Sequence, residues 1–378
     1  MKAHNMEKSQ EFLKVRLRVA WIVVTYACNN KCNFCYAQSM VKKFIEGESL
    51  LHMPLNFAYQ LVDELRKMGI KKFHLIGGEP TVYPHLIDLI EYIKMDKGCY
   101  VAVVTNGRKM GDENYLQELI RAGVDSFQIS IQGADAERHN MVTGSCSFDM
   151  SYKALLNLAH LKFPKFFSAI TVSKDNCDQV EDFIRTMKRE IFVGNHSGKI
   201  FINFATPSIN FDSPGAVNGD YALNPREVAD FVVKIDSLFP HDLYPEIVFS
   251  SRVPICFYPD DFLDKLVKNE RLSSGCSCGV HKSGIVSIDP QGDVLPCTNF
   301  AGTKLFNCRD SNGDFDRDSF INGINNYFPK IKEITHSYPS KNCRGCSKFY
   351  KCFGACLFWW TYFNPDEYIK PLSYDKLS

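Results

Sequence analysis

Apolar stretches alternate with amphipathic stretches along the first half of the chain. Short runs rich in Val, Ile and aromatic residues predict strands at 17–27, 72–76, 100–104, 125–131, 166–173 and 199–204. Between them, apolar residues recur at helical spacing and predict helices at 54–68, 84–95, 112–122, 150–161 and 178–189. This alternation predicts an α/β fold of parallel strands, with functional groups at the C-terminal ends of the strands. The pattern alone permits an open sheet or a partial barrel, and we prefer the barrel.

The first predicted strand leads directly into a loop that carries three cysteines, Cys-Asn-Asn-Lys-Cys-Asn-Phe-Cys at residues 28–35. Three thiolates can hold three irons of a four-iron cluster and leave the fourth iron open to a small chelating ligand. Structural zinc sites and electron-transfer clusters normally have four protein ligands. The alternative interpretation is a zinc site that a distant residue completes.

Polar residues also end the following strands. The second strand leads into Gly77-Gly78-Glu79-Pro80, in which two glycines allow close approach of a ligand and Glu79 offers an acceptor for an ammonium group. The third strand ends at Thr105-Asn106-Gly107, which is either a ligand contact or a simple turn. The fourth ends at Ser130-Ile131-Gln132-Gly133, where Ser130 is either a ligand contact or a strand-end hydroxyl. Thr171 ends the fifth strand in the same way, and Arg138 is a candidate partner for a carboxylate.

The cysteine loop and the Gly-Gly-Glu-Pro segment together resemble the motifs of radical S-adenosylmethionine (SAM) enzymes. The resemblance implies a six-stranded partial (β/α) barrel of the TIM type over about residues 15–205. It also implies that Cys28, Cys32 and Cys35 bind a [4Fe-4S] cluster, whose open iron SAM chelates before one electron cleaves SAM to a 5′-deoxyadenosyl radical. The residues expected to contact SAM are Tyr36, Gly77, Gly78, Glu79, Pro80, Asn106, Ser130, Arg138 and Thr171.

The C-terminal part of the chain is rich in cysteine. Eight of the fifteen cysteines lie between Cys276 and Cys356, around a predicted hairpin at 285–295 with a turn at Asp289-Pro290-Gln291-Gly292. Gly292-x4-Cys297 followed by Cys343-x2-Cys346-x5-Cys352-x3-Cys356 resembles the SPASM extension of radical SAM peptide-modifying enzymes. The resemblance implies two auxiliary [4Fe-4S] clusters, while short paired cysteines also permit zinc.

The resemblance also implies which cysteines share a cluster. Cys343, Cys346 and Cys352 would bind the distal cluster, and Cys278, Cys297 and Cys356 the proximal one, with Cys276 and Cys308 completing the set of eight. The family pattern has a further cysteine after Cys356, and this sequence has none. The final ligand must therefore come from elsewhere or be absent, which would leave an open iron. The isolated Cys99, Cys146, Cys177 and Cys256 are interpreted as small apolar residues.

These patterns predict four regions: an N-terminal extension at 1–14, the barrel at 15–205, a bridge at 206–275 and the SPASM domain at 276–378. Within the bridge, residues 208–220 are either a loop over the barrel mouth or a linker. The aromatic run Phe358-Trp359-Trp360 either lines a peptide groove or packs a small domain, and we favour packing.

Composition narrows the class of protein. The chain is 45% apolar and 23% charged with a net charge of +1, which provides no electrostatic argument for a nucleic-acid or membrane partner. The longest apolar run, at 21–27, is too short to span a bilayer. We therefore expect a cytoplasmic protein.

The resemblance implies a radical SAM/SPASM peptide maturase that installs a crosslink, a cyclised side chain, an epimerised residue or another oxidative modification in a ribosomally synthesised precursor peptide. Only 27 residues precede Cys28, too few for a winged-helix recognition domain, so we expect the barrel mouth and bridge, or a separate recognition protein, to bind the peptide. A flavodoxin or ferredoxin would supply electrons, and no catalytic acid or base is identified. The first alternative is an anaerobic sulfatase-maturating enzyme, although Thr298 stands where that subfamily has an aspartate. The second is a non-catalytic iron-sulfur carrier or zinc-binding scaffold.

Overall fold

The computed structural model describes residues 13–37, 40, 44–45, 47, 50–193, 198–210, 216–272, 284–335 and 337–369. Most of the predicted N-terminal extension lies outside these residues. Cys276 and Cys278, two of the expected auxiliary ligands, lie outside them as well. Among the described helices, none is long and apolar enough to cross a membrane.

The centre of the fold is a curved sheet with the strand order β12-β11-β10-β1-β2-β3-β4-β5-β6-β9. Strands β1 to β6 are parallel and pair in sequence order, as the partial barrel requires. A further parallel strand, β9 (Ile247–Ser250), extends this series beside β6. The α/β fold and all six predicted strands are confirmed, with bounds β1 (Val19–Thr25), β2 (Lys72–Gly77), β3 (Tyr100–Thr105), β4 (Ser126–Ser130), β5 (Phe166–Val172) and β6 (Lys199–Phe204).

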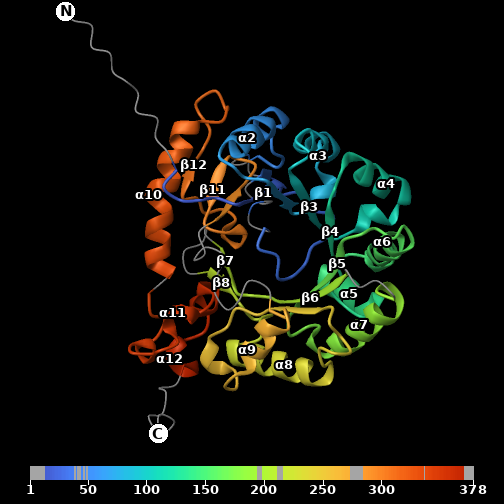
Figure 1. Cartoon of the computed structure of the whole chain (residues 1–378), viewed down its shortest axis with the longest axis vertical. Coiled ribbons are helices and arrows are strands. Elements are labelled where there is room, and N and C mark those ends of the chain that lie inside the picture. Colours follow the sequence, from blue (N-terminus) through green and yellow to red (C-terminus); the bar gives the residue numbers. More distant parts are fainter. Residues whose placement is uncertain are drawn as a thin grey trace, which may run out of the picture.

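Helices cover the outer face of these strands, which curve around the middle of the molecule in Figure 1. Each predicted helix is present, and its apolar stripe packs against the sheet because helix and strand bury their apolar faces together. Their bounds are α2 (Leu55–Lys67), α3 (Leu86–Lys94), α4 (Glu113–Ala122), α6 (Phe148–His160) and α7 (Val180–Thr186).

One helix of the barrel, α5 (Ala136–Thr143), is absent from the sequence-based assignment. Its sequence, AERHNMVT, contains few apolar residues, so the periodicity is weak. Capping signals mark it instead: Asp135 accepts a hydrogen bond from the backbone of Arg138, and Gly144 ends the helix at a φ of 60°. This helix matters because its C-terminal end contacts the cysteine loop.

The predicted C-terminal hairpin is confirmed, but it continues the barrel sheet and does not stand apart from it. Strand β10 (Ile285–Ile288) pairs with β1 in parallel and with β11 (Asp293–Leu295) in antiparallel orientation. Gly292 in the turn has a φ of 78°, and a Cβ there would lie 2.5 Å from Cγ of Arg309. Strand β12 (Phe306–Asn307) ends this edge of the sheet. The hairpin turn is thereby held beside the end of β1.

The bridge contains α8 (Pro225–Leu238) and α9 (Phe262–Lys268), and a buried ion pair within the bridge links α8 to the segment that follows α9. Asn224 and Glu227 form a capping box at the start of α8. Arg271 is fully buried, pairs with Asp236 and donates to the carbonyl oxygen of Phe239 at 2.8 Å. The remaining elements are β7 (Ser208–Asn210), β8 (Ala216–Asn218), α10 (Arg317–Thr335), α11 (Phe349–Cys352) and α12 (Pro365–Tyr368).

A buried hydrogen bond links the strand that carries the cysteine loop to the hairpin turn. The Tyr26 hydroxyl donates to Oδ2 of Asp289 at 2.9 Å. Burial, followed by the nearby charge of Asp293, raises the pKa of Asp289 to about 7. The folded protein therefore binds the Asp289 proton more tightly than the unfolded chain does, and this contribution to stability disappears as pH rises through about 7.

We expect the thermal stability of the wild type to fall, relative to Asp289→Asn, when pH rises from about 6 to about 8. Integrating the proton linkage over that interval gives a loss of about 1.4 kcal/mol, because the asparagine variant has no proton to release. Melting temperatures of both proteins, measured anaerobically across this range, check the prediction. Parallel pH profiles for the two proteins would contradict it.

Candidate functional site

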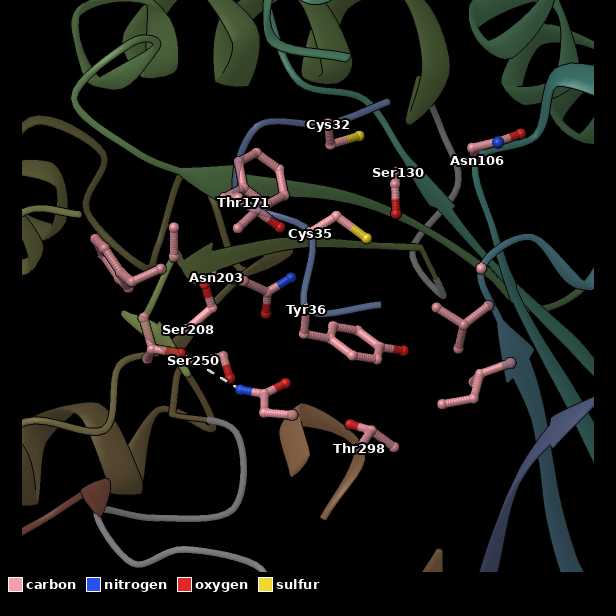
Figure 2. A pocket seen from close by; sticks show the side chains of 18 of the residues that line it. Cys32, Cys35, Tyr36, Asn106, Ser130, Thr171, Asn203, Ser208, Ser250 and Thr298 are labelled. Atoms are coloured by element: carbon pink, nitrogen blue, oxygen red, sulfur yellow. Dashed lines mark hydrogen bonds between the residues drawn. The ribbon is translucent and has the colours of Figure 1, made fainter. Parts of the chain in front are cut away.

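A cavity of about 410 Å³ opens at the C-terminal ends of the barrel strands. Its wall combines the cysteine loop, the ends of β2 to β6 and β9, and residues that follow the C-terminal hairpin. Figure 2 shows Cys32, Cys35 and Ser130 on one side of this space and Thr298 on another. Among the described residues that line it, only Glu79 and Arg252 carry an ordinary side-chain charge.

The cysteine loop is held in place by backbone contacts. Lys31 donates its backbone N–H to the carbonyl oxygen of Thr143 at 2.7 Å, at the end of α5. Backbone N–H groups of Asn30 and Ala37 donate to the sulfurs of Cys28 and Cys35, both at 3.4 Å. Hydrogen bonds to sulfur favour the thiolate form, which is the form that binds metal.

All three cysteines of the loop line the cavity, and their environment fits an iron-sulfur cluster. Burial, followed by the charges of Cys35 and Cys28, raises the pKa of Cys32 to about 12. Bound iron would offset this cost, because thiolates that repel one another are each stabilised by a positive ion. Within the described part of the chain, no three or more His, Cys, Asp or Glu side chains converge as a single metal ion requires. A cubane needs no such convergence, since each thiolate binds a different iron.

Gly77 and Gly78 lie directly against the segment that leads into the cysteine loop. The backbone N–H groups of Gly78 and Glu79 donate to the carbonyl oxygens of Thr25 and Ala27, at 2.7 and 2.8 Å. A Cβ on Gly78 would lie 2.5 Å from the carbonyl oxygens of both Tyr26 and Ala27. Only glycine permits this approach, so the two motifs are positioned as a unit.

Glu79 is 1% exposed and accepts hydrogen bonds at both carboxylate oxygens. Oε1 accepts from the Thr105 hydroxyl and from the Thr81 hydroxyl at 2.6 Å, while Oε2 accepts from the backbone of Asn106 at 2.7 Å. Burial raises the pKa of Glu79, and these donors act in the opposite direction. The contacts fix the carboxylate at the cavity wall, where an ammonium group would complete its pairing.

The structure brings most of the expected SAM contacts together. Tyr36, Gly77, Gly78, Glu79, Asn106, Ser130 and Thr171 all line the cavity. The Tyr36 hydroxyl donates to the carbonyl oxygen of Gly77 at 3.3 Å, and the Asn106 amide donates to Oδ1 of Asn29 at 2.7 Å. Pro80 instead begins a short 3-10 turn and is buried behind the wall.

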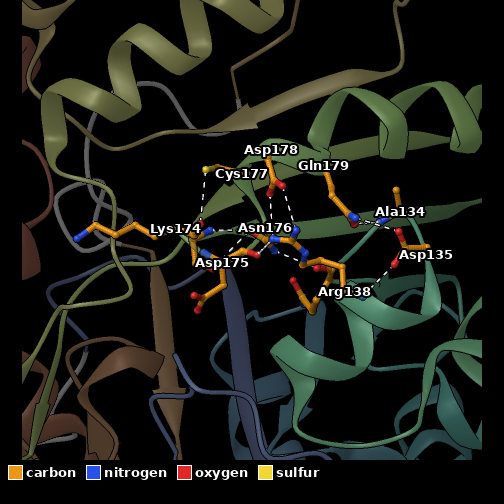
Figure 3. A network of polar contacts seen from close by, with 11 residues as sticks. Ala134, Asp135, Arg138, Lys174, Asp175, Asn176, Cys177, Asp178 and Gln179 are labelled. Carbon is orange, nitrogen blue, oxygen red and sulfur yellow. Dashed lines mark hydrogen bonds and ion pairs between the residues drawn. The ribbon is translucent and has the colours of Figure 1, made fainter.

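Arg138 lies elsewhere. Its guanidinium forms two hydrogen bonds of 3.0 Å with the carboxylate of Asp178, and its backbone N–H donates to Oδ1 of Asp135 at 2.8 Å. Figure 3 shows this network between α5 and the loop after β5. Arg138 is not among the residues that line the cavity, so the structure does not support it as a carboxylate partner there. Its role here is to join α5 to the loop after β5.

The auxiliary cysteines fall into two places. Cys343, Cys346 and Cys352 line a second, smaller cavity, as expected for ligands of one cluster. Cys356 lines the main cavity. Cys297 lies near Tyr36. Burial is the largest cause of the raised pKa of the Tyr36 phenol, and the charges of Cys35 and then of Cys297 raise it further. The assignment of these cysteines to a distal and a proximal cluster stays a prediction, and Cys278 of the proximal group lies outside the described residues.

Cys308 does not join either group. It is fully buried, and its thiol donates to the carbonyl oxygen of Gly292 at 3.0 Å. Burial, followed by the charges of Asp289 and Asp293, raises its pKa. The expectation that Cys308 is a cluster ligand is therefore unsupported, and its contacts indicate a structural role in the hairpin.

Several residues of the cavity wall were not identified from the sequence. Thr206, Pro207 and Ser208 at the start of the bridge belong to the wall, so this part of the bridge is more than a linker. Arg252, Asn299 and Trp359 also contribute, and the Trp359 indole donates to the carbonyl oxygen of Arg252 at 3.0 Å. Trp359 is 1% exposed, so it packs as expected and lines the cavity at the same time. The aromatic run with Trp359 and the segment from residue 208 were candidates for this wall in the sequence, whereas no local pattern marks Arg252 or Asn299, because the fold brings them together from separate segments.

Comparison with known proteins identifies the family. Residues 22–187 match the profile of the Radical SAM superfamily, and this segment contains the cysteine loop and most of the barrel. This segment is a Radical SAM domain. Enzymes of this family use a [4Fe-4S] cluster and SAM, and the three-cysteine loop fits that cluster. Mycofactocin maturase MftC of Mycobacterium ulcerans is 25% identical over 375 residues, covering 93% of this chain and 86% of the relative.

Solved structures of radical SAM proteins share the fold. SuiB of Streptococcus suis bound to S-adenosylmethionine superimposes with a TM-score of 0.65 at 17% identity, over 91% of this chain and 74% of SuiB. The enzyme anSMEcpe, bound to S-adenosylmethionine and the Cp18Cys peptide, gives a TM-score of 0.63 at 17% identity, over 90% and 89% of the two chains. Both likenesses extend through the barrel and into the C-terminal part.

Proposed function

We propose that this radical SAM enzyme is a peptide maturase that oxidatively modifies a ribosomally synthesised precursor peptide. The carrying observation is the composite cavity, in which the SAM-side residues Cys35 and Glu79 share one space with Cys356 and Trp359 of the C-terminal region. Substrate held there lies between the SAM site and the proposed auxiliary clusters. The similarity to a maturase over 93% of the chain supports the same conclusion.

The chain's own residues divide the work of the proposed reaction. Glu79 accepts from the SAM ammonium group, and Tyr36 and Gly77 shape the wall beside it. When bound, the cluster and SAM supply the radical chemistry that breaks an unactivated C–H bond. Trp21, Phe34 and Trp359 provide apolar surface that excludes water from the reacting carbon.

Arg252 is proposed to bind the substrate. It is the one cationic side chain among the described residues of the wall, and its Nε is buried without a hydrogen-bond partner. Its carbonyl oxygen accepts from the backbone of Cys356 and the indole of Trp359, so the residue sits at the junction with the C-terminal region. A guanidinium in this position suits a peptide carbonyl or carboxylate group.

One residue of the cavity wall argues against the alternative function, sulfatase maturation. Thr298, which stands where that subfamily has its aspartate base, lines the cavity. The replacement of a carboxylate by a hydroxyl therefore falls inside the site, where it removes a proton acceptor. Peptide maturation, which does not require that base, therefore fits the residues better. The same proposal includes a cytoplasmic location, two auxiliary [4Fe-4S] clusters and an external flavodoxin or ferredoxin as electron donor.

The test is mass spectrometry of any small peptide encoded beside this gene, after anaerobic co-expression of that peptide with the enzyme. We expect the peptide to lose about two hydrogens per modification, because removal of two electrons and two protons forms one new bond. Fragmentation locates the modified residue. The matched control is co-expression with the variant in which Cys28, Cys32 and Cys35 are replaced by alanine.

An unchanged mass is followed by the same co-expression in heavy water. Epimerisation conserves mass but incorporates deuterium from solvent at the inverted carbon, so a gain of one mass unit would identify that outcome. A peptide without mass loss and without deuterium, in the presence of active SAM cleavage, would reject a peptide substrate encoded at this position.

A further inference from the structure

Cys256 lies in the bridge, far from the C-terminal cysteines in sequence, yet it lines the same small cavity as Cys343, Cys346 and Cys352. Ile255, its neighbour, donates a backbone N–H to the sulfur of Cys352 at 3.4 Å. Four thiols from two distant segments thus surround one space. Three of them belong to the four-cysteine run that ends at Cys356. The family pattern has a further cysteine after this run, and this sequence has none.

The segment that carries Cys256 is fastened on both sides to the C-terminal region. Before it, the carbonyl oxygen of Arg252 accepts from the backbone of Cys356 at 3.1 Å. After it, the carboxylate of Asp260 pairs with the ammonium of Lys348 at 3.2 Å. Between these contacts, Pro254 caps a 3-10 turn at Ile255–Phe257. Cys256 is therefore held at the cavity by its backbone and not by chance packing of a flexible loop.

The chemistry of the cavity favours a thiolate at this position. Of the other residues that line it, Asn342 and Lys348 are polar, and the Lys348 ammonium is a donor that cannot bind iron. Cys343 and Cys352 are each 8% exposed, whereas Cys256 keeps part of its surface exposed to solvent. A thiolate at Cys256 would bind the solvent-facing side of a cluster whose inner side the buried Cys343 and Cys352 hold.

We propose that Cys256 is the fourth protein ligand of the auxiliary cluster bound by Cys343, Cys346 and Cys352. The proposal rests on the auxiliary clusters proposed above and is independent of the peptide substrate. It leaves Cys276, Cys278, Cys297 and Cys356 for the proximal cluster, with Cys308 free for its structural hydrogen bond. The distal cluster then has four protein ligands and no open iron for substrate.

The experiment measures iron, sulfide and electron paramagnetic resonance (EPR) spectra of anaerobically reconstituted protein. All variants carry alanine at Cys28, Cys32 and Cys35, so that only auxiliary iron remains, about eight atoms per chain. We expect Cys256→Ala to reduce iron to between about four and about seven atoms, through loss of the whole cluster or of one iron. Retention of one three-iron cluster would give a new EPR signal in the oxidised protein.

Three further variants make the result decisive. Cys177 is an isolated cysteine whose thiol donates a hydrogen bond to the carbonyl oxygen of Lys174. The variant Cys177→Ser should keep about eight iron atoms per chain. Cys343→Ala should lose iron as Cys256→Ala does; if it retains all eight, the distal cluster assignment itself fails. If circular dichroism shows that Cys256→Ala is misfolded, Cys256→Ser is used in its place, because serine has nearly the side-chain volume of cysteine. This variant should shift the EPR spectrum of the reduced protein. Unchanged iron and unchanged spectra in the folded Cys256 variants would overturn the proposal.

Discussion

Replacement of Cys28, Cys32 and Cys35 by alanine is expected to abolish SAM cleavage while auxiliary iron stays bound. The three thiols line one cavity at the end of β1, and no other described cysteine except Cys356 reaches that cavity. Without them the cluster whose open iron SAM would chelate has no ligands at this position. Liquid chromatography of 5′-deoxyadenosine, formed under strong reductant, measures the loss, and iron should fall from about twelve to about eight atoms per chain.

The control for this result is Cys99→Ala, because Cys99 is 2% exposed in the barrel and lies outside the cavity wall. It should retain SAM cleavage and all of its iron. Formation of 5′-deoxyadenosine by the triple variant would show that the loop is not the SAM-cluster site. Loss of all iron from the triple variant would instead show that the auxiliary sites depend on the loop.

Gly78→Ala is expected to lower SAM cleavage about 100-fold, since a displacement of about 1 Å in a reacting geometry can cost that factor. The added methyl would lie 2.5 Å from the carbonyl oxygens of Tyr26 and Ala27. Both obstacles are backbone atoms directly before Cys28, so relief requires the two motifs to separate. Glu79 would move with Gly78 and lose its position against SAM.

The matched substitution is Gly284→Ala, where the closest atom to a new Cβ is the carbonyl oxygen of Arg16 at 3.5 Å, an ordinary contact. That variant should cleave SAM at close to the wild-type rate. Equal rates for Gly78→Ala and wild type would mean that the Gly-Gly-Glu-Pro segment does not position SAM. Iron content of Gly78→Ala, measured alongside, separates a displaced SAM site from a lost cluster.

The local sequence was sufficient for most elements of the barrel and for the motifs that stand beside them. Short runs rich in Val, Ile and aromatic residues located β1 to β6, and period-3.6 patterns located five helices, because each element buries apolar side chains in the same core. The cysteine triplet and Gly77-Gly78-Glu79 were recognisable because their chemistry depends on short spacing. The C-terminal hairpin was recognisable from its turn, which requires the positive φ of Gly292.

Tertiary structure decided which of these pieces meet. From the sequence, Arg138 was a candidate partner for a carboxylate at the site, but its guanidinium pairs with Asp178. This contact joins distant segments, and no spacing rule in the sequence predicts it. Cys256 looked isolated, but the fold brings it to Cys343, Cys346 and Cys352. Trp359 and Arg252 share a wall with the cysteine loop because β10 pairs with β1 and draws the C-terminal region to the barrel mouth. Local sequence determines short-range geometry, whereas contacts between distant segments follow from the packing of the whole chain.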